Sequence, residues 1–181
     1  MKKAAIFMAD GCEEIEGLTV VDILRRAGIE IHMVSIKDNK EITGSHNIVF
    51  MADRTFKDMD SDYDAYICPG GKKGTENLLH SDDVKNVLVK GCSDGKLIAA
   101  VCAAPTVLGN AGILKDKKAT CYPGFEEKLY CKEFSEDRVV RDGNVITSRG
   151  MGTSIEFALA ITEYLLGRDA ADKISHGIIF R

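Results

Sequence analysis

Apolar runs of strand length alternate along this chain with stretches in which apolar residues recur at helical spacing. The strand candidates are residues 3–9, 29–36, 63–68, 96–101 and 118–121. The helix candidates are residues 13–26 and 75–80, a helix capped by Ser81, a segment from Cys102 to near Gly112, and a last long helix that Gly167 ends. Strands that alternate with helices predict parallel β-α-β units and a sheet covered on both faces.

Two segments depart from this alternation: the first predicts a hairpin or a sheet extension, and the second predicts a β-hairpin. Residues 41–52 hold two short apolar pieces around Gly44-Ser45, and residues 138–149 hold two more around the turn signal Asp142-Gly143. We therefore predict a three-layer α/β sandwich with a mostly parallel central sheet, helices on both faces and a β-hairpin. A single domain over residues 1–181 is expected, since a chain of this length is long enough to build a substantial core.

Composition narrows the function classes. Hydrophobic residues make up 45% and charged residues 29% of the chain, and the net charge is −4, so nucleic acid is not expected as a partner. No apolar stretch of about 18 residues occurs and no signal peptide is recognisable, so we expect no membrane span and a cytoplasmic location. The six cysteines form no C-x-x-C pair and no His/Cys metal spacing, which predicts reduced thiols and no metal site.

The strand candidate at 96–101 ends at Cys102, and small residues with helical potential follow it. Such a strand-to-helix turn presents one side chain at the carboxyl end of a buried strand and directs the next amides toward it. Cys102 is therefore the candidate nucleophile; the alternative is a small buried thiol. The loop at 10–16 and the turn at 69–71 follow other strands, so both are expected at the same edge of the sheet. The turn is either a ligand-binding loop or a plain tight turn.

Four segments together resemble the ThiJ/PfpI superfamily, and more narrowly its DJ-one-like branch with its bacterial members. They are Ile98–Thr106, Asp10–Glu16, Pro69–Gly71 and Thr147–Ser154, in the same order and at similar spacing over nearly the whole chain. The resemblance implies a flavodoxin-like sandwich, a homodimer, a reactive cysteine and no cofactor. It also implies either glyoxalase or deglycase chemistry on small reactive carbonyl compounds, or a stress-response role as a redox sensor or chaperone.

The resemblance assigns roles residue by residue. Cys102 matches the nucleophilic, oxidation-sensitive cysteine, and Glu16 matches the carboxyl that contacts it. Gly71 and Ala103 match the positions whose backbone N–H groups surround the site and would stabilise an oxyanion, and Gly70 lines the site beside them.

At two positions this chain departs from the residues of the family pattern. Arg26 matches one of two arginines that line an anion-binding place near the dimer interface, but the second position holds His46. Where the human-like members have a histidine near the cysteine, this chain has Tyr122, and tyrosine is a weak base at neutral pH. Peptidase activity of the Cys-His type is therefore disfavoured, and Tyr122 is expected to line the site.

The chemistry expected at Cys102 depends on its charge. The amides of the following turn favour a thiolate with a lowered pKa. Two adjacent anions repel, so a Glu16 that touches the sulfur is expected to be protonated, with a raised pKa; an exposed helix carboxylate is the alternative. A thiolate beside such an acid can convert 2-oxoaldehydes to 2-hydroxy acids. Alternatively, the thiol is oxidised to a sulfinate without turnover, or the site is vestigial.

Two further features carry weaker signals. Cys121 precedes Tyr122 and is either a resolving thiol for Cys102 or, more simply, a core cysteine. The segments 148–150 and 152–154 are predicted to form the loop and cap before the last helix, and only the resemblance suggests that they line the site.

Overall fold

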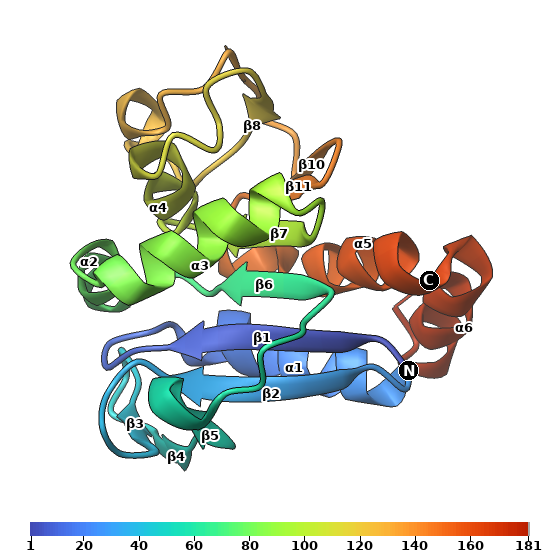
Figure 1. Cartoon of the computed structure of the whole chain (residues 1–181). Coiled ribbons are helices and arrows are strands. Elements are labelled where there is room, and N and C mark those ends of the chain that lie inside the picture. Colours follow the sequence, from blue (N-terminus) through green and yellow to red (C-terminus); the bar gives the residue numbers. More distant parts are fainter. Residues whose placement is uncertain (181) are drawn as a thin grey trace.

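The computed structural model describes residues 1–180, and at its centre lies a seven-stranded sheet in the order β10-β11-β7-β6-β1-β2-β5 (Figure 1). These strands are β1 (Lys3–Met8), β2 (Glu30–Ser35), β5 (Arg54–Thr55), β6 (Ala65–Cys68), β7 (Leu97–Val101), β10 (Val139–Asp142) and β11 (Val145–Ser148). Neighbouring strands pair in parallel except β10 and β11, which form an antiparallel hairpin. The predicted fold class, a flavodoxin-like α/β sandwich with a mostly parallel sheet, is confirmed.

Two small sheets lie outside the central one. Of the two structures predicted over residues 41–52, the hairpin is the one present, because β3 (Glu41–Thr43) pairs in antiparallel fashion with β4 (Val49–Met51). The other small sheet pairs β8 (Lys118–Ala119) in parallel with β9 (Glu133–Phe134). The segment that contains β8 and β9 extends past the end of the central sheet beside α4 (Pro105–Asn110; Figure 1).

The helices are α1 (Glu14–Arg26), α2 (Lys72–Leu79), α3 (Asp82–Ser93), α4 (Pro105–Asn110), α5 (Ser154–Leu166) and α6 (Arg168–Gly177). Short 3₁₀ turns occupy Phe56–Asp58, Glu126–Lys128 and Met151–Thr153. Ser81 caps α3 as predicted, since its Oγ accepts the Val84 N–H at 3.3 Å. Over residues 1–180, no helix is long and apolar enough to cross a membrane.

Strand β7 divides its side chains between two cores. Leu97, Ala99 and Val101 lie in the core beneath α1 and α5, whereas Ile98 and Ala100 lie in the core beneath α2, α3 and α4. All five residues are 0% exposed. A parallel strand that is buried on both faces has this continuous apolar sequence, and it provides a rigid support for the residue that follows it.

Some boundaries differ from the predictions for local physical reasons. Asp142 pairs with Val145, so the hairpin turn consists of Gly143 and Asn144 rather than of Asp142 and Gly143. Helix α4 begins only at Pro105, because proline fits the first helical turn, where its missing N–H leaves no bond unmade. Strand β5 and helix α6 were not predicted: β5 has two residues, and α6 follows α5 directly after Gly167.

Candidate active site

Cys102 is held in a strained backbone conformation directly after β7. Its φ is 64°, in the left-handed region that costs a residue with a side chain about 1–3 kcal/mol. Its N–H donates to the Ser148 carbonyl at 3.0 Å, and its carbonyl accepts the Tyr122 N–H at 2.8 Å. These bonds fix the turn from both sides, so the sulfur projects from the carboxyl end of the sheet, as the sequence predicts.

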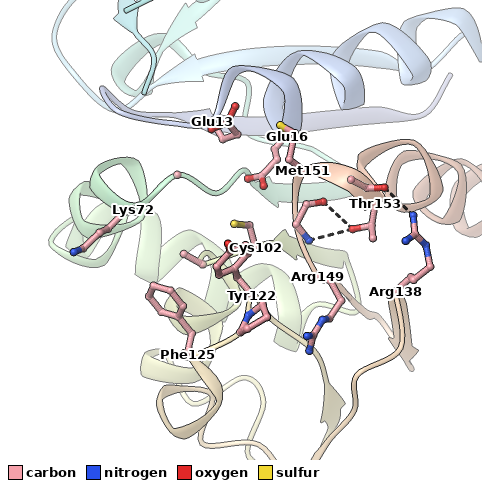
Figure 2. A pocket seen from close by; sticks show the side chains of 15 residues that line it. Glu13, Glu16, Lys72, Cys102, Tyr122, Phe125, Arg138, Arg149, Met151 and Thr153 are labelled. Atoms are coloured by element: carbon pink, nitrogen blue, oxygen red, sulfur yellow. Dashed lines mark hydrogen bonds between the residues drawn. The ribbon is translucent and has the colours of Figure 1, made fainter. Parts of the chain in front are cut away.

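Glu16 approaches the sulfur from the first turn of α1. Its side chain is buried, with the whole residue 1% exposed, and one carboxylate oxygen accepts the Gly70 N–H at 3.0 Å. The carboxyl also shares a hydrogen bond with the Cys102 thiol, toward which it points in Figure 2. Glu16 is thus the buried partner of the cysteine and not an exposed helix carboxylate.

The glycine turn after β6 makes this approach possible. A Cβ on Gly70 would collide with the Glu16 carboxylate and with Cys102 Cβ. Gly71 has a φ of 88°, and a Cβ there would collide with the backbone of the loop before α1. The backbone N–H groups of Gly71 and Ala103 hydrogen-bond the Cys102 sulfur. The turn therefore shapes the site and is more than a connection.

Glu16 and Cys102 influence each other's pKa. Burial raises the pKa of Glu16 to about 7, against the hydrogen bonds from Cys102 and Gly70, which favour its charged form. Burial and then the Glu16 charge raise the pKa of Cys102 to about 12, although the Gly71 and Ala103 amides act to lower it. This corrects the expected lowered thiol pKa, because two amides do not offset desolvation plus an adjacent carboxylate. Both shifts favour the protonated form of their group.

A cavity of about 680 Å³ opens above the sulfur. Its lining residues come from segments far apart in the chain: Glu13, Glu16, Gly71, Lys72, Cys102, Ala103, Tyr122, Pro123, Phe125, Arg138, Arg149, Gly150, Met151, Gly152 and Thr153. The structure thus brings the predicted residues Glu16, Gly71, Ala103 and Tyr122 together around Cys102. Gly70, also predicted to line the site, is not among the lining residues, although its N–H binds Glu16. The loop before α5 also lines the cavity, as the resemblance suggested.

Six lining residues were not singled out from the sequence: Glu13, Lys72, Pro123, Phe125, Arg138 and Met151. Lys72 directly follows the glycine turn, and Phe125 lies three positions after Tyr122, so their proximity to predicted residues was an available signal. Arg138 offered none. It reaches the cavity through the fold, where it pairs with Glu156 at 2.6 Å and donates to the Gly152 carbonyl at 2.7 Å.

Three other candidates do not line the cavity above the sulfur. Arg26 is at the end of α1, pairs with Asp22 at 2.6 Å, and borders a different surface depression. Arg26 therefore does not line the Cys102 cavity, and its role at an anion-binding place near a dimer interface stays a prediction. His46 contacts Glu14, with Nδ1 3.2 Å from the carboxylate. Cys121 is buried in the core and is not among the residues that line the cavity.

Within residues 1–180, two clusters bring three metal-type ligand atoms within 4.8 Å of one another. They are Glu13, Glu14 and His46, and Glu30, His32 and Asp60. In the second cluster Lys3 already pairs with both acids, at 3.8 Å and 3.2 Å. Cys102 belongs to neither cluster.

Similarity to known proteins extends over almost the whole chain. The sequence profile of the DJ-1/PfpI family matches residues 2–164. The chain is 38% identical over 185 residues to the Parkinson disease protein 7 homolog of Danio rerio, covering 99% of this chain and 98% of that protein. It is 39% identical over 183 residues to the protein DJ-1 homolog B of Arabidopsis thaliana, covering 99% of this chain but only 42% of that longer protein. The chain thus spans less than half of this plant relative.

Two further relatives bear on fold and chemistry. A protein named deglycase from Pyrococcus abyssi is 30% identical over 153 residues, which covers 83% of this chain and 91% of that one. The solved structure of oxidized Toxoplasma gondii DJ-1 superimposes with a TM-score of 0.95 at 34% identity, covering 99% of this chain and 98% of that one. Because the matched region includes the strained cysteine, its buried glutamate and the glycine turn, the chain belongs to the DJ-1/PfpI family.

Proposed function

We propose that this protein is a cysteine-dependent enzyme of stress defence that converts 2-oxoaldehydes to 2-hydroxy acids without a cofactor. The observation that carries the proposal is the contact between the Cys102 thiol and Glu16, a buried carboxyl with its pKa raised to about 7. A group that titrates near neutral pH can both accept and return a proton during one turnover. The name deglycase carried by the Pyrococcus abyssi relative supports chemistry on reactive carbonyl compounds.

The first step forms a bond between sulfur and carbon. As the Cys102 sulfur adds to the aldehyde carbon, the thiol proton passes to the Glu16 carboxylate. The thiol, whose pKa is raised to about 12, therefore does not have to ionise before it attacks. Negative charge develops on the former aldehyde oxygen beside the N–H groups of Gly71 and Ala103. One such donor is worth on the order of 3 kcal/mol in well-studied enzymes. Glu16 then returns the proton to the former aldehyde oxygen, which gives a hemithioacetal.

The second step moves hydrogen between two carbons. Glu16 removes the proton from the carbon bonded to sulfur, giving an enediolate. Glu16 then returns this proton to the neighbouring carbon, while the hydroxyl proton of the first carbon passes to the neighbouring oxygen. One carbon is oxidised while its neighbour is reduced, so no external oxidant is needed, and a thioester of the 2-hydroxy acid remains on Cys102. Water cleaves this thioester, releases the acid and restores the thiol. The balance is one 2-oxoaldehyde plus one water to one 2-hydroxy acid.

The direct test is lactate formation from methylglyoxal by the purified protein, without added thiol or metal. A Cys102→Ser preparation serves as the blank, because it keeps the shape of the site and lacks the nucleophilic sulfur. We expect lactate to accumulate with the unmodified protein and not with the blank. Equal rates in the two preparations would exclude the proposed reaction.

A redox role of the same thiol is a second candidate, supported by the donors that surround the sulfur. A sulfinate on Cys102 would accept hydrogen bonds from the Gly71 and Ala103 amides and from protonated Glu16. We expect mild peroxide to add two oxygen atoms at Cys102 and then to stop, as measured by intact mass and peptide mapping. The Cys102→Ser variant should gain no oxygen under the same conditions. Oxidation that begins at another cysteine would contradict this role.

The homodimer, chaperone activity and cytoplasmic location stay predictions from the sequence.

A further inference from the structure

Exposed apolar side chains gather at the cavity above Cys102. Tyr122 is 50% exposed and Met151 is 51% exposed, and both line that cavity. Phe125 lines it as well and packs edge-on against Tyr122, with ring centroids 6.5 Å apart. Large apolar groups that remain exposed within a concave site indicate contact with a ligand.

The ring of Tyr122 is held close to the reactive sulfur. The Tyr122 N–H donates to the Cys102 carbonyl at 2.8 Å, which ties the two residues together through the backbone. The point where a Cβ on Gly150 would lie is 3.3 Å from Tyr122 Cδ2 and 4.0 Å from Cys102 Sγ. Because glycine leaves that space open, an atom of a bound molecule can touch the Tyr122 ring while the molecule is bonded to the sulfur.

Phe125 continues this apolar surface away from the sulfur. The Phe125 N–H donates to the Tyr122 carbonyl at 3.3 Å, across a turn that contains Gly124 with a φ of 90°. The Lys128 ammonium lies 5.7 Å from the centroid of the Phe125 ring. Backbone and side-chain contacts therefore hold the two rings as a pair.

The two rings and Glu16 lie on opposite sides of Cys102 (Figure 2). A 2-oxoaldehyde that reacts at the sulfur must present its two reacting carbons to Glu16, so its remaining substituent is directed toward the rings. We infer that Tyr122 and Phe125 form a subsite for an apolar substituent, aryl groups above all, so that aryl 2-oxoaldehydes are better substrates than methylglyoxal. This inference rests on the proposed function and adds the class of substrate. Edge-on and offset contacts between aromatic rings provide the attraction.

The kinetic test compares phenylglyoxal with methylglyoxal. We expect the ratio of their kcat/KM values to favour phenylglyoxal in the unmodified protein and to fall about tenfold in Tyr122→Ala and in Phe125→Ala. Comparing ratios between variants removes the difference in intrinsic reactivity of the two aldehydes. Tyr122→Phe should keep the ratio, because the ring remains. Tyr130→Ala is the matched control, since Tyr130 is 66% exposed and is not among the residues that line the cavity.

A binding test needs no turnover. Mandelate and lactate are the products expected from the two aldehydes and differ only in phenyl against methyl. Titration calorimetry with Cys102→Ser should show mandelate binding about tenfold more tightly than lactate, and the added Tyr122→Ala change should remove the difference. If neither aldehyde is turned over but mandelate binding still depends on Tyr122, the subsite stands and the proposed function fails. If both are turned over at a ratio that neither ring substitution changes, the subsite is overturned and the function stands.

Discussion

Replacement of Glu16 by glutamine will lower kcat/KM for methylglyoxal by about 10³-fold, within the range of general acid–base contributions. Glutamine has the same shape, and its amide oxygen can still accept the Gly70 N–H that the carboxylate accepts at 3.0 Å. It cannot accept a proton from the thiol or from carbon, so both proposed proton transfers stop. The measurement is lactate formation under initial-rate conditions, and the main loss should be in kcat rather than in KM.

Glu13→Gln is the matched control, because Glu13 lines the same cavity but is not a hydrogen-bond partner of the Cys102 thiol. Its loss should remain below about tenfold, since it takes no part in general acid–base catalysis. Equal losses in the two variants would contradict a proton-transfer role and indicate a general effect of negative charge.

The same Glu16 variant should also change how stability depends on pH. Burial raises the pKa of Glu16 from 4.5 in the unfolded chain to about 7, so the folded protein binds this proton more tightly. The stabilising contribution is complete below the unfolded pKa and is lost as pH rises through the folded pKa, a difference of about 3 kcal/mol. Denaturant unfolding in mildly acidic and mildly alkaline buffers should show this loss in the unmodified protein. Glu16→Gln should remove it, and an unchanged pH dependence would contradict the assignment.

Gly70→Ala is the second substitution with a large expected effect. The new methyl group would meet the Glu16 carboxylate, Cys102 Cβ at 2.6 Å and the Val101 carbonyl at 3.0 Å, so the acid and the thiol must move apart. A displacement of about 1 Å can cost about 10²-fold in rate, and we expect at least this loss of kcat/KM for methylglyoxal. Overpacking should also lower the free energy of unfolding by about 1–3 kcal/mol.

Gly177→Ala provides the control for Gly70→Ala. Gly177 ends α6, and a Cβ there meets nothing within 4 Å. We expect neither activity nor the midpoint of denaturant unfolding to fall in this variant. A Gly70→Ala protein with full activity would show that the contact between Glu16 and Cys102 tolerates displacement, and the proposed proton transfers would then need another geometry.

The sequence by itself determined the architecture and the central residue of the site. The continuous apolar run of β7 predicted a strand buried on both faces, and all five of its residues are 0% exposed. The abrupt change to Cys102 and small residues predicted the strand-to-helix turn, and parallel topology predicted that the glycine turn and the loop before α1 would lie at the same edge. These features are encoded locally, in the periodicity of apolar residues and in the turn residues. The resemblance of the four segments to the family then identified Glu16 as the carboxyl that contacts Cys102.

Only the tertiary structure decided which side chains meet and how they titrate. The lowered thiol pKa expected from local amides was wrong because burial and the Glu16 charge arise from packing between α1, β6 and β7. Arg26 lies on the same helix as Glu16, yet its position near the far end of α1 takes it to another surface. Tyr122 and Phe125 reach Cys102 through one long-range backbone hydrogen bond. Contacts of this kind depend on how distant segments pack, which no local pattern of residues specifies.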